Sequence, residues 1–236
     1  MGEQVEFDVA GDVVSGYLSR PPGSERAPGV VLIHEAWGLD EVTRRQADRL
    51  ASMGYLVLAP DLLTRGPRFG CMVSVFRDLR RGSGRAFDDL QAARAFLLDS
   101  PACSGQVGVM GMCMGGGFAL LLAGRGEYAV AAPFYGVLPQ TPDLLRNACP
   151  VVASYGGKDA SLKGSAAKLE AALTRFGVPN DVVEYPDAGH SFLNDEPNAP
   201  RLVAPLMAGA GAGPHPESAQ DAWSRVERFF GTHLRG

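Results

Sequence analysis

Residues 106–122, QVGVMGMCMGGGFALLL, contain the sequence pattern of a strand, a sharp turn and a helix in succession. Residues 107–110 are a short apolar run, which is typical of a buried strand. The turn 111–115 follows, and the apolar run 116–123 predicts a helix that faces the core. A nucleophile elbow has this order of strand, glycine-flanked nucleophile and helix. The motif here is G-x-C-x-G, so Cys113 stands where the nucleophile would be.

The cysteine in this motif has a structural interpretation as well as a catalytic one. A cysteine at a strand–helix junction is more often a small buried hydrophobic residue than a nucleophile. Glycines in such a turn can also bind phosphate, but Met112, Cys113 and Met114 put bulk where a dinucleotide-binding turn needs bare backbone. The motif alone leaves the choice open, and the rest of the chain has to decide it.

Length and composition restrict the classes of protein to consider. The 236 residues predict one domain, spanning 1–236, or at most two, and the apolar fraction of 46% is ordinary for a globular protein. A net charge of −4 does not suggest nucleic-acid or membrane binding. No apolar run approaches about 18 residues, the length of a membrane-spanning helix. The acidic N-terminus also lacks the pattern of a signal sequence.

The four cysteines, at positions 71, 103, 113 and 149, have neither the spacing of a metal site nor that of a disulfide framework. We therefore expect no metal and no other cofactor, and a reducing cytoplasm fits this composition. A small molecule is the expected partner, and the expected assembly is a monomer or a small homo-oligomer.

Predicted strands and helices alternate along most of the chain. The predicted strands are 5–9, 13–18, 29–33, 55–59, 107–110, 128–134, 150–155 and 181–185, and the predicted helices are 41–53, 85–98, 116–123, 161–176 and 217–231. The first two strands favour an antiparallel hairpin at a sheet edge. The alternation predicts an α/β fold with a mostly parallel sheet covered by helices on both faces. In such a sheet, ligands bind at the carboxyl ends of the strands.

Two segments lack a clear periodicity. Residues 64–84 are rich in Arg and Gly, and we expect a loop with one helical segment at 73–79. An insertion near the strand ends is a candidate lid. Residues 194–216 are also expected to be a loop.

Two further residues directly follow predicted strands. Asp159 comes after strand 150–155 and His190 after strand 181–185. Alone, Asp159 could cap a helix and His190 could be a polar loop residue. The chain order of nucleophile, acid and histidine is, however, that of α/β-hydrolases. A nucleophile needs a base, and the base needs a carboxylate that orients it. The three residues together therefore predict a Cys113–His190–Asp159 triad.

The chain resembles the dienelactone hydrolase (carboxymethylenebutenolidase) family nearly from end to end. The motifs that carry this resemblance are GMCMGG at 111–116, GGKD at 156–159, AGHSF at 188–192, HE at 34–35, PDL at 60–62, DAW at 221–223 and FF at 229–230. A cysteine elbow combined with a glutamate after strand 29–33 is fairly specific, because most other branches of the fold use serine.

The resemblance implies a hydrolase that cleaves an ester, often a small lactone, through a covalent acyl-enzyme. Cys113 would attack the carbonyl, His190 would transfer the proton and Asp159 would fix the imidazole. The family's glutamate, matched by Glu35, contacts the thiol and helps to control its ionisation; the alternative for Glu35 is a solvated loop acid. The oxyanion hole matches the backbone N–H groups of Met114 and Ala36.

One feature of the best-studied members is missing from the expected place. Those enzymes grip a substrate carboxylate with two arginines, and one of them follows the histidine where this chain has Leu193-Asn194-Asp195. The other lies in the segment that matches 64–84, which is shorter here but contains five arginines, Arg68 among them. The sequence therefore does not support the carboxylate clamp. The expected substrate-binding residues are Trp37, Arg68, Tyr135, Phe192 and Asn194, with Phe134 as a further candidate wall.

Two other functions remain open from the sequence. The domain could be a redox-sensing or binding protein whose thiol is oxidised and not catalytic. It could also be an acyltransferase or a general carboxylesterase of the same fold. Turnover of ester panels separates catalysis from sensing, and dependence on an acceptor alcohol or amine separates transfer from hydrolysis.

Overall fold

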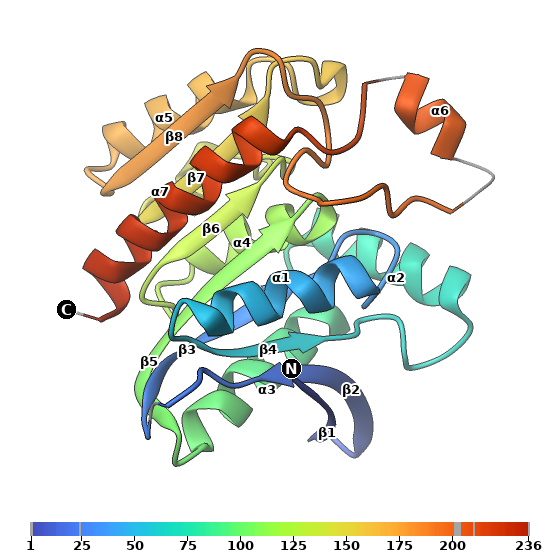
Figure 1. Cartoon of the computed structure of the whole chain (residues 1–236), viewed down its shortest axis with the longest axis vertical. Helices are drawn as coiled ribbons and strands as arrows, with labels where there is room; N and C mark the ends of the chain where they lie inside the picture. The colour runs from blue at the N-terminus through green and yellow to red at the C-terminus, as the bar shows by residue number, and fades with distance from the viewer. Residues whose placement is uncertain (1, 24, 201–203, 210, 236) are drawn as a thin grey trace.

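An eight-stranded sheet forms the centre of the computed structural model, which describes residues 2–23, 25–200, 204–209 and 211–235 (Figure 1). The strands are β1 (Glu3–Val9), β2 (Asp12–Ser19), β3 (Ala27–Ile33), β4 (Leu56–Pro60), β5 (Cys103–Met112), β6 (Ala131–Phe134), β7 (Val151–Gly156) and β8 (Asn180–Tyr185). Their order in the sheet is β1-β2-β4-β3-β5-β6-β7-β8. The β1–β2 and β2–β4 pairs are antiparallel and all other pairs are parallel, which confirms the predicted α/β fold and its edge hairpin.

Helices cover both faces of this sheet (Figure 1). One face carries α1 (Glu41–Ser52) and α7 (Pro216–Leu234), and the other carries α3 (Arg85–Asp99), α4 (Met114–Ala123) and α5 (Ser165–Arg175). The helices α2 (Arg68–Arg81) and α6 (Ala204–Gly209) lie beyond the carboxyl ends of the strands. None of the helices within the described ranges is both long and apolar enough to cross a bilayer.

The centre of the sheet is the most deeply buried part of the chain. Val30, Val31, Leu32 and Ile33 of β3 are completely buried, because α1 and α3 cover the two faces of the sheet around this strand. A strand covered on both faces is apolar at every position, and this is why the run at 29–33 indicated a central strand so clearly.

The prediction of a loop at 64–84 was mostly wrong, because α2 occupies Arg68–Arg81. The helix buries only Val75, Asp78 and Leu79, while Phe69, Val73 and Phe76 are exposed. Apolar residues therefore lie on more than one side of α2, which obscures the 3.6-residue period that marks a helix packed on a core. Whether this segment acts as a lid stays a prediction.

Other boundaries also differ from the predictions. Strand β6 begins only at Ala131, and α5 begins at Ser165 because Gly164 has φ +74°, a left-handed conformation outside the helical region. A short 3₁₀ helix, Ala160–Leu162, takes the place of the predicted first turn of α5. The predicted loop 194–216 contains α6, while residues 201–203 and 210 lie outside the described residues.

Candidate active site

Cys113 occupies a strained turn between β5 and α4. Its φ of 54° and ψ of −115° lie where a non-glycine residue rarely stays without support from its surroundings. Neighbouring backbone explains the flanking glycines. A Cβ at Gly111 would lie 2.1 Å from the carbonyl oxygen of Gly115, and one at Gly115 would lie 2.3 Å from that of Ile33. Only glycine fits at these two positions, so the local geometry is that of a nucleophile elbow.

His190 and Asp159 meet at the same edge of the sheet. Asp159 follows β7 and His190 follows β8, and His190 Nδ1 lies 2.5 Å from Asp159 Oδ2. The other carboxylate oxygen of Asp159 accepts hydrogen bonds from the backbone N–H of Ser161 at 3.0 Å and from its hydroxyl at 2.6 Å. Asp159 is therefore held in place beside Nδ1 of the imidazole, and the contact with Asp159 leaves Nε2 unoccupied.

The charges around His190 favour its protonated form. Burial lowers the pKa of the imidazole, but the hydrogen bond to Asp159 and the neighbouring Cys113 thiol outweigh burial, and the pKa rises well above its usual value. The pKa of Asp159 is lowered: burial alone would raise it, but the hydrogen bonds from His190 and Ser161 more than offset this. The pair is therefore poised as a carboxylate and an imidazolium.

Glu35 is a buried carboxylate, with only 3% of its surface exposed, held by donors from the segment after β8. Oε1 accepts from the Ser191 hydroxyl at 2.9 Å, and Oε2 accepts from Asn194 Nδ2 at 3.3 Å and from Asn198 Nδ2 at 2.9 Å. All three donors are uncharged. The Glu35 carboxylate is thus held by hydrogen bonds from neutral side chains.

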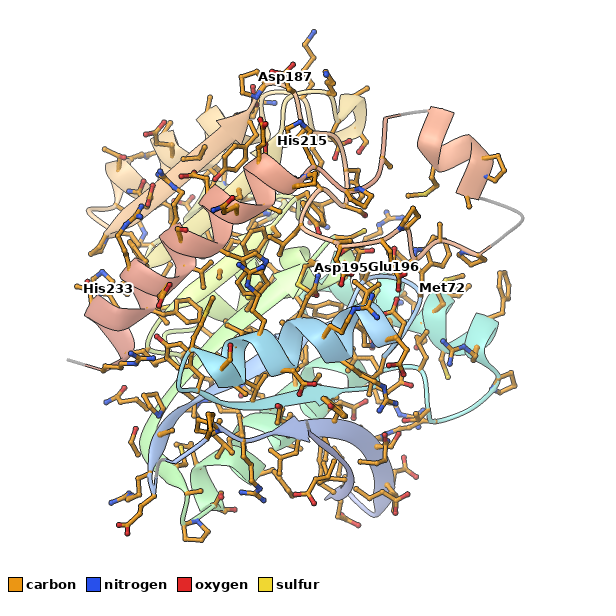
Figure 2. The ribbon with its side chains drawn as sticks, viewed as in Figure 1. Met72, Asp187, Asp195, Glu196, His215 and His233 are labelled. Atoms are coloured by element: carbon orange, nitrogen blue, oxygen red, sulfur yellow. The ribbon has the colours of Figure 1, made fainter. Side chains whose placement is uncertain are left out.

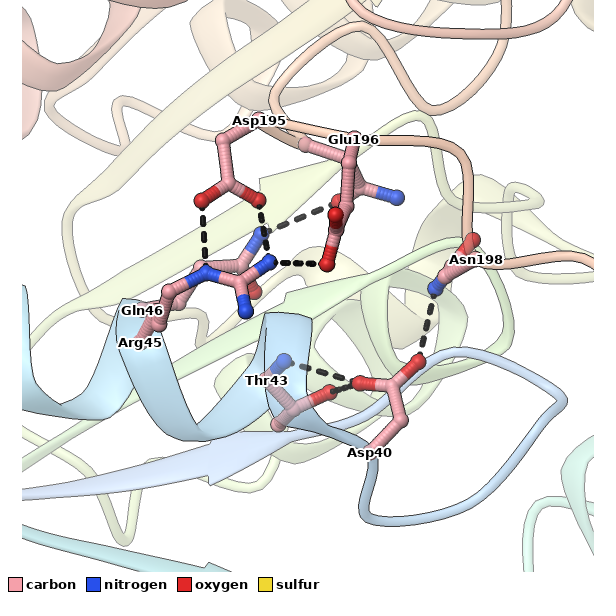
Figure 3. Close-up of polar contacts among 8 residues, drawn as sticks. Asp40, Thr43, Arg45, Gln46, Asp195, Glu196 and Asn198 are labelled. Carbon is pink, nitrogen blue, oxygen red and sulfur yellow. Dashed lines mark hydrogen bonds and ion pairs between the residues drawn. The ribbon is translucent and has the colours of Figure 1, made fainter.

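Further contacts join the segment after β8 to α1 (Figure 3), and Figure 2 shows Asp195 and Glu196 of this segment near the helix. Arg45 binds Asp195 through two nitrogens at 2.6 and 2.9 Å and binds Glu196 at 2.6 Å. Figure 3 also shows Asn198 donating to Asp40, at 3.0 Å, at the start of the helix. The same segment carries His190 and the three donors of Glu35, so it contacts both α1 and Glu35.

His34 positions the peptide bond between Glu35 and Ala36, and the N–H group of Ala36 is one of the two expected donors of the oxyanion hole. Its Nδ1 lies 2.5 Å from the carbonyl oxygen of Glu35, and its Nε2 accepts the backbone N–H of Leu62 at 3.1 Å. An Nε2 that accepts is unprotonated, and burial lowers the pKa of His34, so the ring is neutral and donates from Nδ1. The peptide bond is planar and trans, so anchoring the Glu35 carbonyl turns the N–H of Ala36 the opposite way.

A cavity of about 930 Å³ brings most of the predicted site residues together. Those that line it are Glu35, Ala36, Trp37, Cys113, Met114, Tyr135, Asp159 and His190. The Tyr135 ring lies 5.0 Å from the His190 ring, and its buried hydroxyl has no hydrogen-bond partner among the described residues. Burial first, and then the charge of Glu35, raise the pKa of Tyr135, which keeps the hydroxyl protonated beside the site.

The remaining predicted substrate-binding residues are not among those that line the cavity. Arg68 Nη2 donates to the carbonyl oxygen of Trp37 at 2.5 Å. Phe192 is buried against Phe134, Tyr135 and Tyr185. Asn194 is buried between Glu35 and Gln46, from which it accepts a hydrogen bond at 3.0 Å. These side chains support residues that line the cavity.

Sequence reasoning missed Ser191, Asn198 and His34 as functional candidates. Ser191 and His34 belong to motifs that carry the family resemblance, but nothing in either motif shows which partner the side chain contacts. Asn198 lies in a segment with no periodicity, and only the fold brings it to Glu35. Within the described ranges, no three or more His, Cys, Asp or Glu side chains are grouped so that they could hold a metal ion.

The sheet order, the elbow and the acid and histidine after β7 and β8 define an α/β-hydrolase. The sequence model of the dienelactone hydrolase family matches residues 14–234, so the chain belongs to the dienelactone hydrolase family, a family of hydrolases.

A relative carries the name of this family, and two solved structures share the fold. The chain is 29% identical over 194 residues to the carboxymethylenebutenolidase of Pseudomonas putida, covering 75% of this chain and 80% of that protein. The crystal structure of dienelactone hydrolase from Anabaena variabilis has a TM-score of 0.68 at 22% identity and covers 100% of this chain and 99% of its own. A dienelactone hydrolase-like promiscuous phosphotriesterase from metagenomic libraries has a TM-score of 0.80 at 23% identity, with 99% and 98% covered. The two structures show the same fold.

Proposed function

We propose that the protein hydrolyses carboxylic esters through Cys113, His190 and Asp159 by way of a covalent acyl-enzyme. One observation supports the proposal most strongly. The strained Cys113 elbow and the His190–Asp159 pair, whose atoms lie 2.5 Å apart, line the same cavity. Each residue comes from the end of a different strand. A purely structural cysteine would need neither the strained backbone nor an oriented imidazole beside it.

The first half-reaction forms a thioester. The Cys113 sulfur, whose proton is held by His190 at Nε2 as the imidazolium, attacks the ester carbonyl, and the C–S bond forms as the carbonyl π electrons move to oxygen. The N–H groups of Met114 and Ala36 would stabilise this oxyanion. The first turn of α4 also favours negative charge close to the sulfur. When the oxyanion collapses, the C–O bond breaks and His190 gives its Nε2 proton to the departing alkoxide, which leaves as an alcohol.

The second half-reaction restores the enzyme. His190, now neutral, takes a proton from water as the water oxygen attacks the thioester carbonyl. The C–S bond then breaks, the acid leaves, and the thiolate and imidazolium are regenerated. Glu35 is proposed to tune the thiol through its charge and to take no part in acyl transfer, because both of its oxygens are already occupied by Ser191, Asn194 and Asn198.

Mass spectrometry of the intact protein tests the proposal. Rapid acid quenching during turnover of an activated ester should show a population heavier by one acyl group, mapped to Cys113. Transfer of the acyl group to an added alcohol or amine in preference to water would make the protein an acyltransferase. Oxidation of Cys113 without any ester turnover would make it a redox sensor. All four cysteines are free thiols, which supports a reducing compartment, and we propose the cytoplasm.

A further inference from the structure

The cavity extends beyond the reacting groups as an apolar groove. Four parts of the chain form this extension: Phe76 and Leu79 of α2, Gly117 and Leu121 of α4, the segment 137–140, and Leu144. Its walls include exposed apolar side chains: Val137 is 51% exposed, Leu144 48% and Phe76 39%. A cluster of exposed apolar side chains along a concave surface is typical of a ligand-binding groove.

The far wall of the groove is fixed in place. Gln140 Nε2 donates to the carbonyl oxygen of Arg80 at 2.7 Å, and Arg125 Nη2 donates to that of Gly82 at 2.8 Å. These bonds satisfy carbonyls at the end of α2 that have no partner within the helix. Asp78 accepts the backbone N–H of Ala86 at 3.2 Å and joins the same end to α3. The groove is therefore already formed before a ligand enters.

The direction of the groove selects one side of the ester. His190 has to reach the leaving oxygen, so the alcohol part lies toward His190 and the wall formed by residues 159–162. The acyl part is then left to run along α4 toward α2. We propose that this groove binds an extended, uncharged acyl chain, so that the preferred substrates are apolar esters of medium chain length. This inference rests on the proposed function, because it names the substrate of the same site.

The two arginines at the far end do not change this assignment. Arg80 and Arg81 line the end of the groove but are exposed. Exposed ion pairs contribute little, since water screens them. Their aliphatic stems can cover the apolar wall while the guanidinium groups stay in water. A carboxylate on the acyl chain would gain little there and would meet an apolar wall on the way.

The test is a chain-length series of p-nitrophenyl esters from acetate to decanoate. Burial of a methylene group changes binding by up to roughly fourfold, so six partly buried methylenes should raise kcat/KM for octanoate over acetate by roughly 60-fold. Val137→Asp should lower this octanoate-to-acetate ratio at least tenfold. The matched control is Val13→Asp, on an exposed valine (56%) of the remote edge hairpin, which should leave the ratio as it is. A flat series, or an equal change in the control, would overturn the proposal.

Two further arms separate the alternatives. A p-nitrophenyl ester of an acyl chain with a terminal carboxylate should be hydrolysed more slowly than octanoate. The inference is overturned if the carboxylate-bearing ester is hydrolysed faster than octanoate and if Arg81→Gln abolishes this difference. Such a result would show that the groove recognises a charged chain. If esters are not hydrolysed at Cys113 at all, the proposed function fails, and the groove is tested by 2-decanone. The ketone should quench Trp37 fluorescence in Cys113→Ala, and the further change Val137→Asp should weaken this binding; equal binding by both proteins contradicts the groove.

Discussion

Glu35→Gln is the substitution whose effect on stability the structure determines most closely. It keeps the shape of the side chain and removes its charge, but it exchanges one acceptor oxygen for an NH₂ group. Oε2 accepts from Asn194 and Asn198, so the amide oxygen takes that place, and the NH₂ group faces the Ser191 hydroxyl, which can accept from it but can no longer donate to residue 35. Asn198 keeps a second acceptor, Asp40, at 3.0 Å. Ser191 is buried, and its hydroxyl loses the acceptor that Glu35 provides.

The expected cost follows from this one donor. Leaving a buried donor unpaired costs about 1–3 kcal/mol, so we expect Glu35→Gln to fold and to lose about 2 kcal/mol in its free energy of unfolding. Urea unfolding followed by circular dichroism measures the difference. Glu41→Gln is the control, because Glu41 lies on the exposed side of α1 and should change stability by less than about 0.5 kcal/mol. A Glu35→Gln protein more stable than wild type would refute the reasoning. Burying the charge of Glu35 would then destabilise the wild-type fold by more than the hydrogen bonds to its carboxylate stabilise it.

The same variant reports on the thiol. Glu35 and Cys113 line the same cavity, and a carboxylate close to a sulfur opposes negative charge on it. Removal of the Glu35 charge should therefore increase the rate of iodoacetamide alkylation of Cys113 below neutral pH. Turnover should decrease, because the charge of Glu35 no longer tunes the thiol. The pH profiles of alkylation and of turnover are compared between variant and wild type. Two unchanged profiles would remove Glu35 from the mechanism.

Three more predictions address the acid, the nucleophile and the cavity wall. Asp159→Asn should lower the pKa of His190 toward or below 6.5 and slow alkylation of Cys113 at pH 7 at least tenfold, with partial recovery at higher pH. The raised pKa of His190 stabilises the wild-type fold below pH 6.5, and this contribution disappears as the pH rises through about 10. The difference in free energy of unfolding between wild type and Asp159→Asn should therefore shrink between these pH values. A difference that grows contradicts the ion pair. Cys113→Ser should fold and lose at least roughly a hundredfold in kcat/KM, about 2.7 kcal/mol, measured with one activated ester at matched pH; full activity would show that a thiol is not needed. Arg68→Gln frees the Trp37 carbonyl and should change relative rates among acidic and neutral esters while activated-ester hydrolysis stays within about tenfold; a collapse on all substrates would place Arg68 in the catalytic machinery.

Local patterns in the sequence were enough to predict the framework of the fold. The buried strands β3 and β5 are apolar at successive positions because helices cover them on both faces, and such runs are visible without a structure. The residues Cys113, Asp159 and His190 follow strands in a parallel sheet, so their meeting at one edge was also predictable. Gly111 and Gly115 were also recognisable from the sequence as parts of the elbow, because only glycine tolerates the close backbone around Cys113.

The walls of the site depend on contacts across the chain. Asn198 is 163 positions from Glu35 in the sequence, and no local pattern predicts that the two side chains meet. The helix α2 exposes Phe69, Val73 and Phe76, of which Phe76 lines the groove, so its sequence lacks the one-sided pattern of an ordinary surface helix. Arg68 stays a predicted substrate-binding residue, and its contact with the Trp37 carbonyl, 31 positions away, is one that no local pattern predicts.

The most direct test of Cys113 as the nucleophile combines acyl trapping with one substitution. Wild type and Cys113→Ala are mixed with the same activated ester, quenched in acid and digested, and each peptide is weighed. The proposed mechanism predicts a mass increase of one acyl group on the Cys113 peptide of the wild type. It predicts neither adduct nor turnover in Cys113→Ala, whose circular dichroism should match wild type. Turnover by a folded Cys113→Ala protein at the wild-type rate would contradict the mechanism.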